Sequence, residues 1–151
     1  MHERLFTEIE GSYEELATLV RQIAPTRAAH PNLLGTWSAK EILAHLIGWE
    51  EEAVMVLCAM RDGTPLPQPI ADEHAFNARS VERRQEKSWE ELHLEWRETH
   101  HALMAVVSSM PAAQQDDARV VNWLQGSTIN HYRLHQSDFA KAAEPPPNDT
   151  P

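Results

Sequence analysis

Four long stretches of this chain repeat apolar residues at spacings of three and four, and this period constrains the fold more than any other feature. Gly11-Ser12 with Glu15 leaves a later start of the first stretch open, because this is a capping-box pattern. No stretch alternates apolar and polar residues as a half-buried strand does. We therefore predict an all-α fold, an antiparallel four-helix bundle with long helices over residues 5–24, 38–62, 88–110 and 127–143.

The connections between these helices differ in character. Residues 63–69 contain three prolines and are expected to form a stiff surface loop. A weaker helical pattern over residues 71–84, anchored by Phe76 and Val81, predicts a short extra helix in the crossover between the second and third long helices. Residues 112–126 are interpreted as a polar connection with room for one helical turn. Residues 144–151 are proline-rich and expected to be disordered, which leaves a single domain over residues 1–143.

The charge balance limits the partners. The 151 residues include 23 acidic side chains against 13 Lys and Arg, a formal net charge of -10, so we expect no binding to nucleic acid or to anionic membranes. A small molecule, a metal ion or another protein remains compatible. No window approaches the ~18 apolar residues of a membrane span, and the first residues do not resemble a secretory signal. We expect a cytoplasmic protein, with Cys58 as a small buried hydrophobe.

Three of the nine histidines are arranged in a way that suggests chemistry. His131 and His135 stand four apart in the fourth helix, so both imidazoles can reach one ion. His45 lies in the apolar stripe of the second helix and is the best candidate for a third ligand. The alternatives are two ordinary boundary histidines and one core histidine satisfied by a hydrogen bond.

Three neutral imidazoles would leave open positions on a divalent zinc, nickel, iron or manganese ion, as in a reactive site. Glu52 and Asp138 are candidate bases, and a solvated or ligand-orienting role is the alternative for both. His100 or His101 could approach the same cavity, but adjacent helical residues diverge, so at most one could.

Two tryptophans are candidates for a substrate pocket. Trp49 follows His45 on the second helix, and Trp123 precedes the histidine pair. Core packing is the alternative for both, and a pocket wall beside the histidines is the functional interpretation.

The histidines lie in segments that resemble a known superfamily. The sequence Trp37-Ser-Ala-Lys-Glu-Ile-Leu-Ala-His45-Leu-Ile-Gly-Trp49-Glu, followed far downstream by His131-Tyr-Arg-Leu-His135, is similar to the DinB-like superfamily. Residues 72–88, with Phe76-Asn77 after a proline-rich loop, look like its ClbS/DfsB branch. The resemblance implies an up-down-down-up bundle, often a homodimer, with His45, His131 and His135 as ligands of a divalent metal ion.

Activities in the superfamily are diverse, so the resemblance leaves several functions open. The first hypothesis is a metal-dependent enzyme that acts on a small molecule by hydrolysis or thiol transfer. The second is a small-molecule binding or self-protection protein of the ClbS/DfsB type that requires no metal. The third is a dimerising bundle without chemistry.

Overall fold

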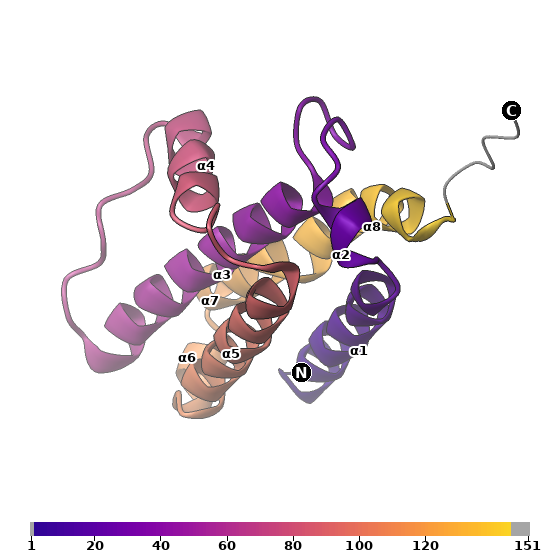
Figure 1. Ribbon diagram of the computed structural model, residues 1–151. Helices are drawn as coiled ribbons and strands as arrows, with labels where there is room; N and C mark the ends of the chain where they lie inside the picture. The colour runs from indigo at the N-terminus through magenta and orange to yellow at the C-terminus, as the bar shows by residue number, and fades with distance from the viewer. Residues whose placement is uncertain (1, 146–151) are drawn as a thin grey trace, which may run out of the picture.

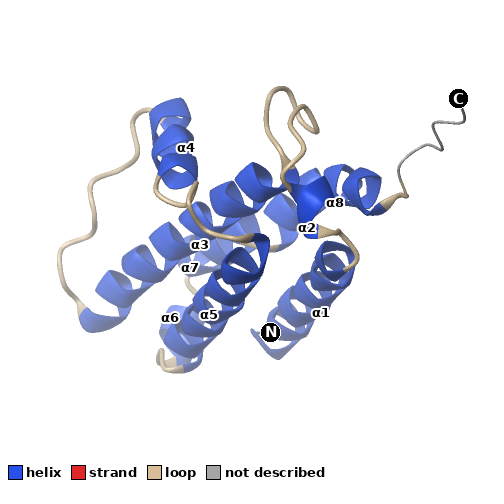
Figure 2. Ribbon diagram, viewed as in Figure 1, coloured by secondary structure: helices blue, strands red, loops and turns tan. Residues whose placement is uncertain are grey.

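The computed structural model describes residues 2–145, and this part of the chain contains eight helices and no strand (Figure 2). The prediction of an all-α fold is confirmed. The disorder predicted for residues 144–151 is not tested, because residues 146–151 lie outside the described residues. The helices are α1 (His2–Arg21), α2 (Pro25–Ala28), α3 (Ala39–Asp62), α4 (Glu73–Glu82), α5 (Trp89–Ser108), α6 (Ala112–Gln115), α7 (Ala118–Ser127) and α8 (Ile129–Ala143).

Three long helices and the consecutive pair α7–α8 pack together (Figure 1). Helix α3 packs mainly on α5, α1 packs mainly on α8, and α3 also contacts both α7 and α8. The short helix α4 lies against α3 outside these elements and is reached by the extended proline-rich loop (Figure 1). The predicted extra helix of the crossover is therefore present.

Local signals in the sequence place the ends of the helices. Ser38 and Glu41 form the reciprocal capping box at the start of α3, and Gly63 ends that helix in the left-handed conformation at φ 68°. Ser88 caps α5 by accepting the backbone N–H of Glu91. Helix α1 begins at His2 and runs through Gly11, so the later start is not used.

The interpretation of residues 112–126 as a polar connection was wrong. Most of this segment is helical, as α6 and α7, and Val120 and Leu124 of α7 are buried at a spacing of four. Asp117 caps α7 by accepting the backbone N–H of Arg119. The helical chain breaks at Thr128, whose φ of -119° and ψ of -93° separate α7 from α8.

A buried polar cluster joins four helices in the middle of the apolar core. The Glu50 carboxylate of α3 is 0% exposed and accepts the indole N–H of Trp96 at 2.8 Å and the hydroxyl of Tyr132 at 2.6 Å. His100 of α5 lies with Nδ1 3.8 Å from Glu50 and Nε2 3.0 Å from Glu10 of α1. Directional bonds of this kind fix how the helices are aligned along one another.

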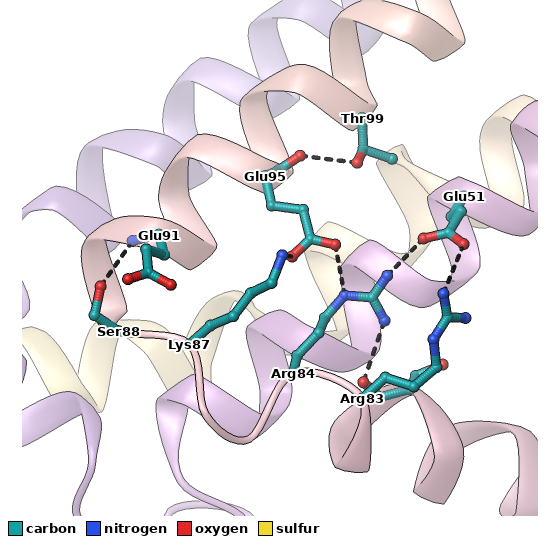
Figure 3. A network of polar contacts seen from close by, with 9 residues as sticks. Glu51, Arg83, Arg84, Lys87, Ser88, Glu91, Glu95 and Thr99 are labelled. Carbon is teal, nitrogen blue, oxygen red and sulfur yellow. Dashed lines mark hydrogen bonds and ion pairs between the residues drawn. The ribbon is translucent and has the colours of Figure 1, made fainter.

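Helix α4 is held on α3 by a close backbone approach and by a buried arginine. A Cβ built on Gly48 would lie 2.7 Å from the Cβ of Ser80, so only glycine fits at this contact. The Arg84 side chain is 3% exposed and donates to Glu51 of α3, to Glu95 of α5 and to the Ser80 carbonyl (Figure 3). This network fixes the short helix to the bundle.

Candidate metal centre

The three predicted histidines meet between α3 and α8. His45 comes from the second turn of α3, and His131 and His135 come from the first two turns of α8. One ring nitrogen of each lies within 4.8 Å of the others, and Nε2 of His45 is 2.8 Å from Nε2 of His131. The spacing suits three ligands of a single ion.

A residue of helix α4 determines which ring nitrogen of His45 carries the proton. The amide oxygen of Asn77 accepts the indole N–H of Trp49 at 2.8 Å and lies 2.9 Å from Nδ1 of His45. Because an indole only donates, the atom facing both rings is an oxygen, and Nδ1 of His45 must carry its proton. The lone pair of His45 is then on Nε2, and two lone pairs cannot face each other at 2.8 Å without a proton or a cation between them.

The carboxylate of Asp138 determines which ring nitrogen of His135 carries the proton. Oδ2 of Asp138 lies 3.2 Å from Nδ1 of His135, so Nδ1 donates and Nε2 holds the lone pair. That Nε2 is buried and has no hydrogen-bond partner. An orphaned imidazole nitrogen beside two others, with its second nitrogen oriented by a carboxylate, is the arrangement that metal-ligating histidines show. The residues therefore fit a divalent ion.

Burial keeps His45 and His131 in the neutral form, which can bind a metal ion. Burial, and secondly the neighbouring His135, lowers the pKa of His45 to about 4. Burial, followed by His45 and His135, lowers the pKa of His131 to about 3. Both imidazoles are therefore neutral near pH 7 and have a lone pair available for a cation.

A cavity of about 680 Å³ opens onto the three imidazoles. Its volume is in the range of small-molecule sites. Trp49 and Trp123, the two predicted pocket residues, both line it, as do Trp37 and Leu134. Asn77 and the first turn of α4 form another side, so the segment after the proline-rich loop completes the pocket.

Several other sequence-based candidates have different surroundings. Asp138 has the ligand-orienting position described above, and Glu52 does not line the cavity. The expectation that His100 or His101 approaches the cavity was wrong: His100 belongs to the Glu50 cluster, and His101 is exposed. Burial by itself lowers the pKa of His100, but Glu50 and Glu10 outweigh burial, and the net shift is upward.

Asn77 is the residue of the candidate site that pattern reasoning missed. It lies 32 positions after His45, on a short helix whose apolar pattern is weak. The sequence gives no sign that the two residues are in contact. The only available signal was its place in the segment that resembles the ClbS/DfsB branch. Glu50 did leave a signal, since it lies four residues after Leu46 and three before Ala53, on the apolar face of α3.

The fold and this cluster define a class: a helical bundle with three inward-facing histidines at one pocket. A family model described as the mycothiol maleylpyruvate isomerase N-terminal domain matches residues 10–138, and the chain belongs to this family. The resemblance to the DinB-like superfamily is thereby confirmed. A comparison with curated proteins finds no match.

Among solved structures, the chain is similar to the colibactin self-resistance protein ClbS in complex with a double-stranded DNA. The two chains are 16% identical, the match covers 95% of each, and the TM-score is 0.79. At this identity the likeness shows a shared fold, which is that of the ClbS-type branch.

This comparison corrects the exclusion of nucleic acid. Net charge led us to exclude it, yet a protein of the same fold is seen with double-stranded DNA. Net charge sums over the whole surface and does not describe any one face, so it was not a sufficient reason.

The helices within residues 2–145 include none with the length and apolar character to cross a membrane.

Proposed function

We propose that this protein is a divalent-metal-dependent enzyme in which His45, His131 and His135 hold the ion, with zinc, nickel, iron or manganese as candidates. The observation that carries the proposal is the convergence of three imidazole nitrogens within 4.8 Å, two of them with the opposite ring nitrogen engaged by Asn77 and Asp138. When bound, the ion supplies Lewis acidity that lowers the pKa of a bound water or thiol.

The nucleophile comes from outside the chain. Within the described residues, the cavity lining includes no cysteine or lysine. The hydroxyl of Ser127, which does line it, donates to the carbonyl of Trp123 at 2.7 Å. A water or a small thiol activated by the ion is the proposed nucleophile, and the proposed reaction is hydrolysis or thiol transfer to a small molecule. Thiol transfer is supported by the family description, which names the thiol mycothiol.

Metal content tests the proposal directly. Protein purified without a polyhistidine tag is measured by elemental analysis beside the His131→Ala/His135→Ala double variant and a His101→Ala control, in which an exposed histidine is removed. We expect one ion per chain in the wild type and the control, and none in the double variant. A wild type that is metal-free and fails to take up any of the four candidate ions at neutral pH would refute the proposal.

Isotope labelling separates the two reactions. The metal-loaded protein is incubated with an aryl ester or an α,β-unsaturated ketone in H₂¹⁸O containing a small thiol. One ¹⁸O in the carboxylate released from the ester, with loss of the phenol, identifies hydrolysis. A thioester formed from the ester, or a thioether formed by addition to the ketone, identifies thiol transfer. The loss of either product in the double variant, but not in the His101→Ala control, would assign the reaction to the histidine site.

A second candidate is a binding or self-protection role without a required metal, favoured by the fold shared with the self-resistance protein ClbS. A ligand that binds the chelated protein as tightly as the loaded protein, without turnover, would support this function. Double-stranded DNA is a suitable ligand to include in the comparison. The homodimer and the cytoplasmic location are further proposals, and sedimentation analysis tests the first.

A further inference from the structure

Three tryptophans line the cavity, and the rings of Trp49 and Trp37 have contacts with neighbouring side chains. Trp49 donates its indole N–H to Asn77, and its ring packs on Phe76 with the ring centres 4.5 Å apart. Trp37 lies with its ring centre 5.1 Å from that of His45. Trp123 lines the same space from α7. Rings restricted by such contacts lose less side-chain freedom when an occupant packs against them.

An apolar side chain also remains uncovered at this cavity. Leu134 is 69% exposed although it lies on the lining, directly before His135. A flat apolar occupant that reached the histidines from the tryptophan side would cover part of this surface.

The lining holds one carboxylate and four imidazoles. Apart from those of His45, His74, His131 and His135, the only ionisable side chain there is Glu73 in the first turn of α4, and no lysine or arginine lines the cavity within residues 2–145. Maleylpyruvate, the compound in the family's name, is a dicarboxylate, and this lining offers it no arginine or lysine to pair with. Indole faces and a carboxylate instead favour a positive charge.

We infer that the cavity itself, without a bound ion, prefers an aromatic cation, bound between the tryptophans with its charge toward Glu73, over an aromatic carboxylate. This preference belongs to the lining and is measured without the metal, whose own positive charge would act against it. It names a class of ligand that differs in charge from the compound after which the family is named.

Three probes that share the naphthalene ring and differ in charge test the preference. The full-length chain, stripped of metal with EDTA, is titrated calorimetrically at pH 7.5 with (1-naphthylmethyl)trimethylammonium, 1-naphthylmethanol and 1-naphthoate. We expect the ammonium probe to bind most tightly and the carboxylate to bind about tenfold or more weakly than it. Because the metal ion has been removed, the carboxylate probe cannot bind by coordinating it. The quaternary nitrogen of the ammonium probe has no lone pair and cannot coordinate a metal ion either.

Charge-matched variants identify the source of the preference. Glu73→Gln should weaken the ammonium probe about fivefold and leave the alcohol unchanged, an effect of the size that a partly exposed ion pair has. Glu82→Gln is the control, because Glu82 is an exposed residue of the same helix outside the lining. Trp123→Leu should weaken all three probes.

Three results would overturn the inference: a carboxylate that binds as well as the ammonium probe, equal effects of the two glutamine variants, or no binding of any probe. Metal content is measured on the same preparations before chelation. A metal-free wild type with the expected order of probes would therefore remove the proposed reaction and leave the cavity preference intact.

Discussion

Gly48→Ala is the substitution that best tests how α4 controls the histidine site. The added methyl would lie 2.7 Å from the Cβ of Ser80, and an ordinary contact needs about 4 Å. If α4 moves outward to restore it, the shift is about 1 Å. The 2.9 Å separation between Asn77 and Nδ1 of His45 then exceeds the hydrogen-bond range, and the proton on Nδ1 is no longer fixed.

The expected effect on stability is small and the effect on metal binding is large. Overpacking costs about 1–3 kcal/mol, and the better helix propensity of alanine offsets about 1 kcal/mol, so the free energy of unfolding should fall by about 0–2 kcal/mol. Loss of a hydrogen bond that orients a ligand typically lowers metal affinity about 10- to 100-fold. Chelator competition measures the affinity, and urea unfolding measures the stability.

Gly11→Ala is the matched control, because a methyl there meets nothing within 4 Å and the position is also inside a helix. It should leave the metal affinity unchanged and raise the stability by about 0.5–1 kcal/mol. In the Gly48→Ala/Ser80→Gly double variant the clash is removed, and much of the affinity should return. Wild-type affinity in Gly48→Ala would refute the claim that this close approach holds Asn77 on His45.

Three further predictions concern Asn77, Glu50 and Arg84. Asn77→Leu removes the acceptor on His45, so we expect metal affinity to fall about 10- to 100-fold in chelator competition, and an unchanged value would contradict the tautomer argument. Burial raises the pKa of Glu50 above its ordinary 4.5, and the pKa of His100 is raised as well, so the folded chain holds these two protons more tightly and their contribution to stability falls as the pH rises. The lowered pKa values of His45 and His131 act in the opposite direction, so the contribution is measured against a variant: in urea titrations the wild type should lose stability relative to Glu50→Gln as the pH rises, and a difference independent of pH would count against this. Arg84→Met should lower the free energy of unfolding by about 1–3 kcal/mol, less than for a fully buried ion pair, because its carboxylate partners are 38% and 21% exposed and can be hydrated; a thermal midpoint within error of the wild type would contradict this.

The sequence predicted the histidine cluster because each member left a local trace. The i, i+4 spacing of His131 and His135 places both on one face of a helix, and His45 interrupts an apolar stripe. Ser38 and Ser88, where the second and third long helices were predicted to begin, are likewise the N-caps of α3 and α5. Such traces depend on residues a turn or two apart, which is the range over which helical geometry is fixed.

Contacts between distant segments left no such trace. Asn77 reaches His45 only because α4 docks on α3, and that docking depends on the pairing of Gly48 with Ser80 and on the position of Arg84. The helix α7 was missed for a different reason: the polar residues around Val120 and Leu124 obscured an apolar spacing of four. The prediction that excluded nucleic acid was wrong because the net charge of the chain does not say where charges lie on its surface.

The amide oxygen of Asn77 accepts two hydrogen bonds at once, one from the imidazole of His45 and one from the indole of Trp49. A compound that pushes the Trp49 ring aside must strain or break the bond from its N–H, which leaves the oxygen to His45 alone and makes it a better acceptor there. Occupancy of the aromatic wall is thereby transmitted to the basicity of the imidazole behind it. A ligand in the cavity and the lone pair of His45 are therefore linked through a single atom.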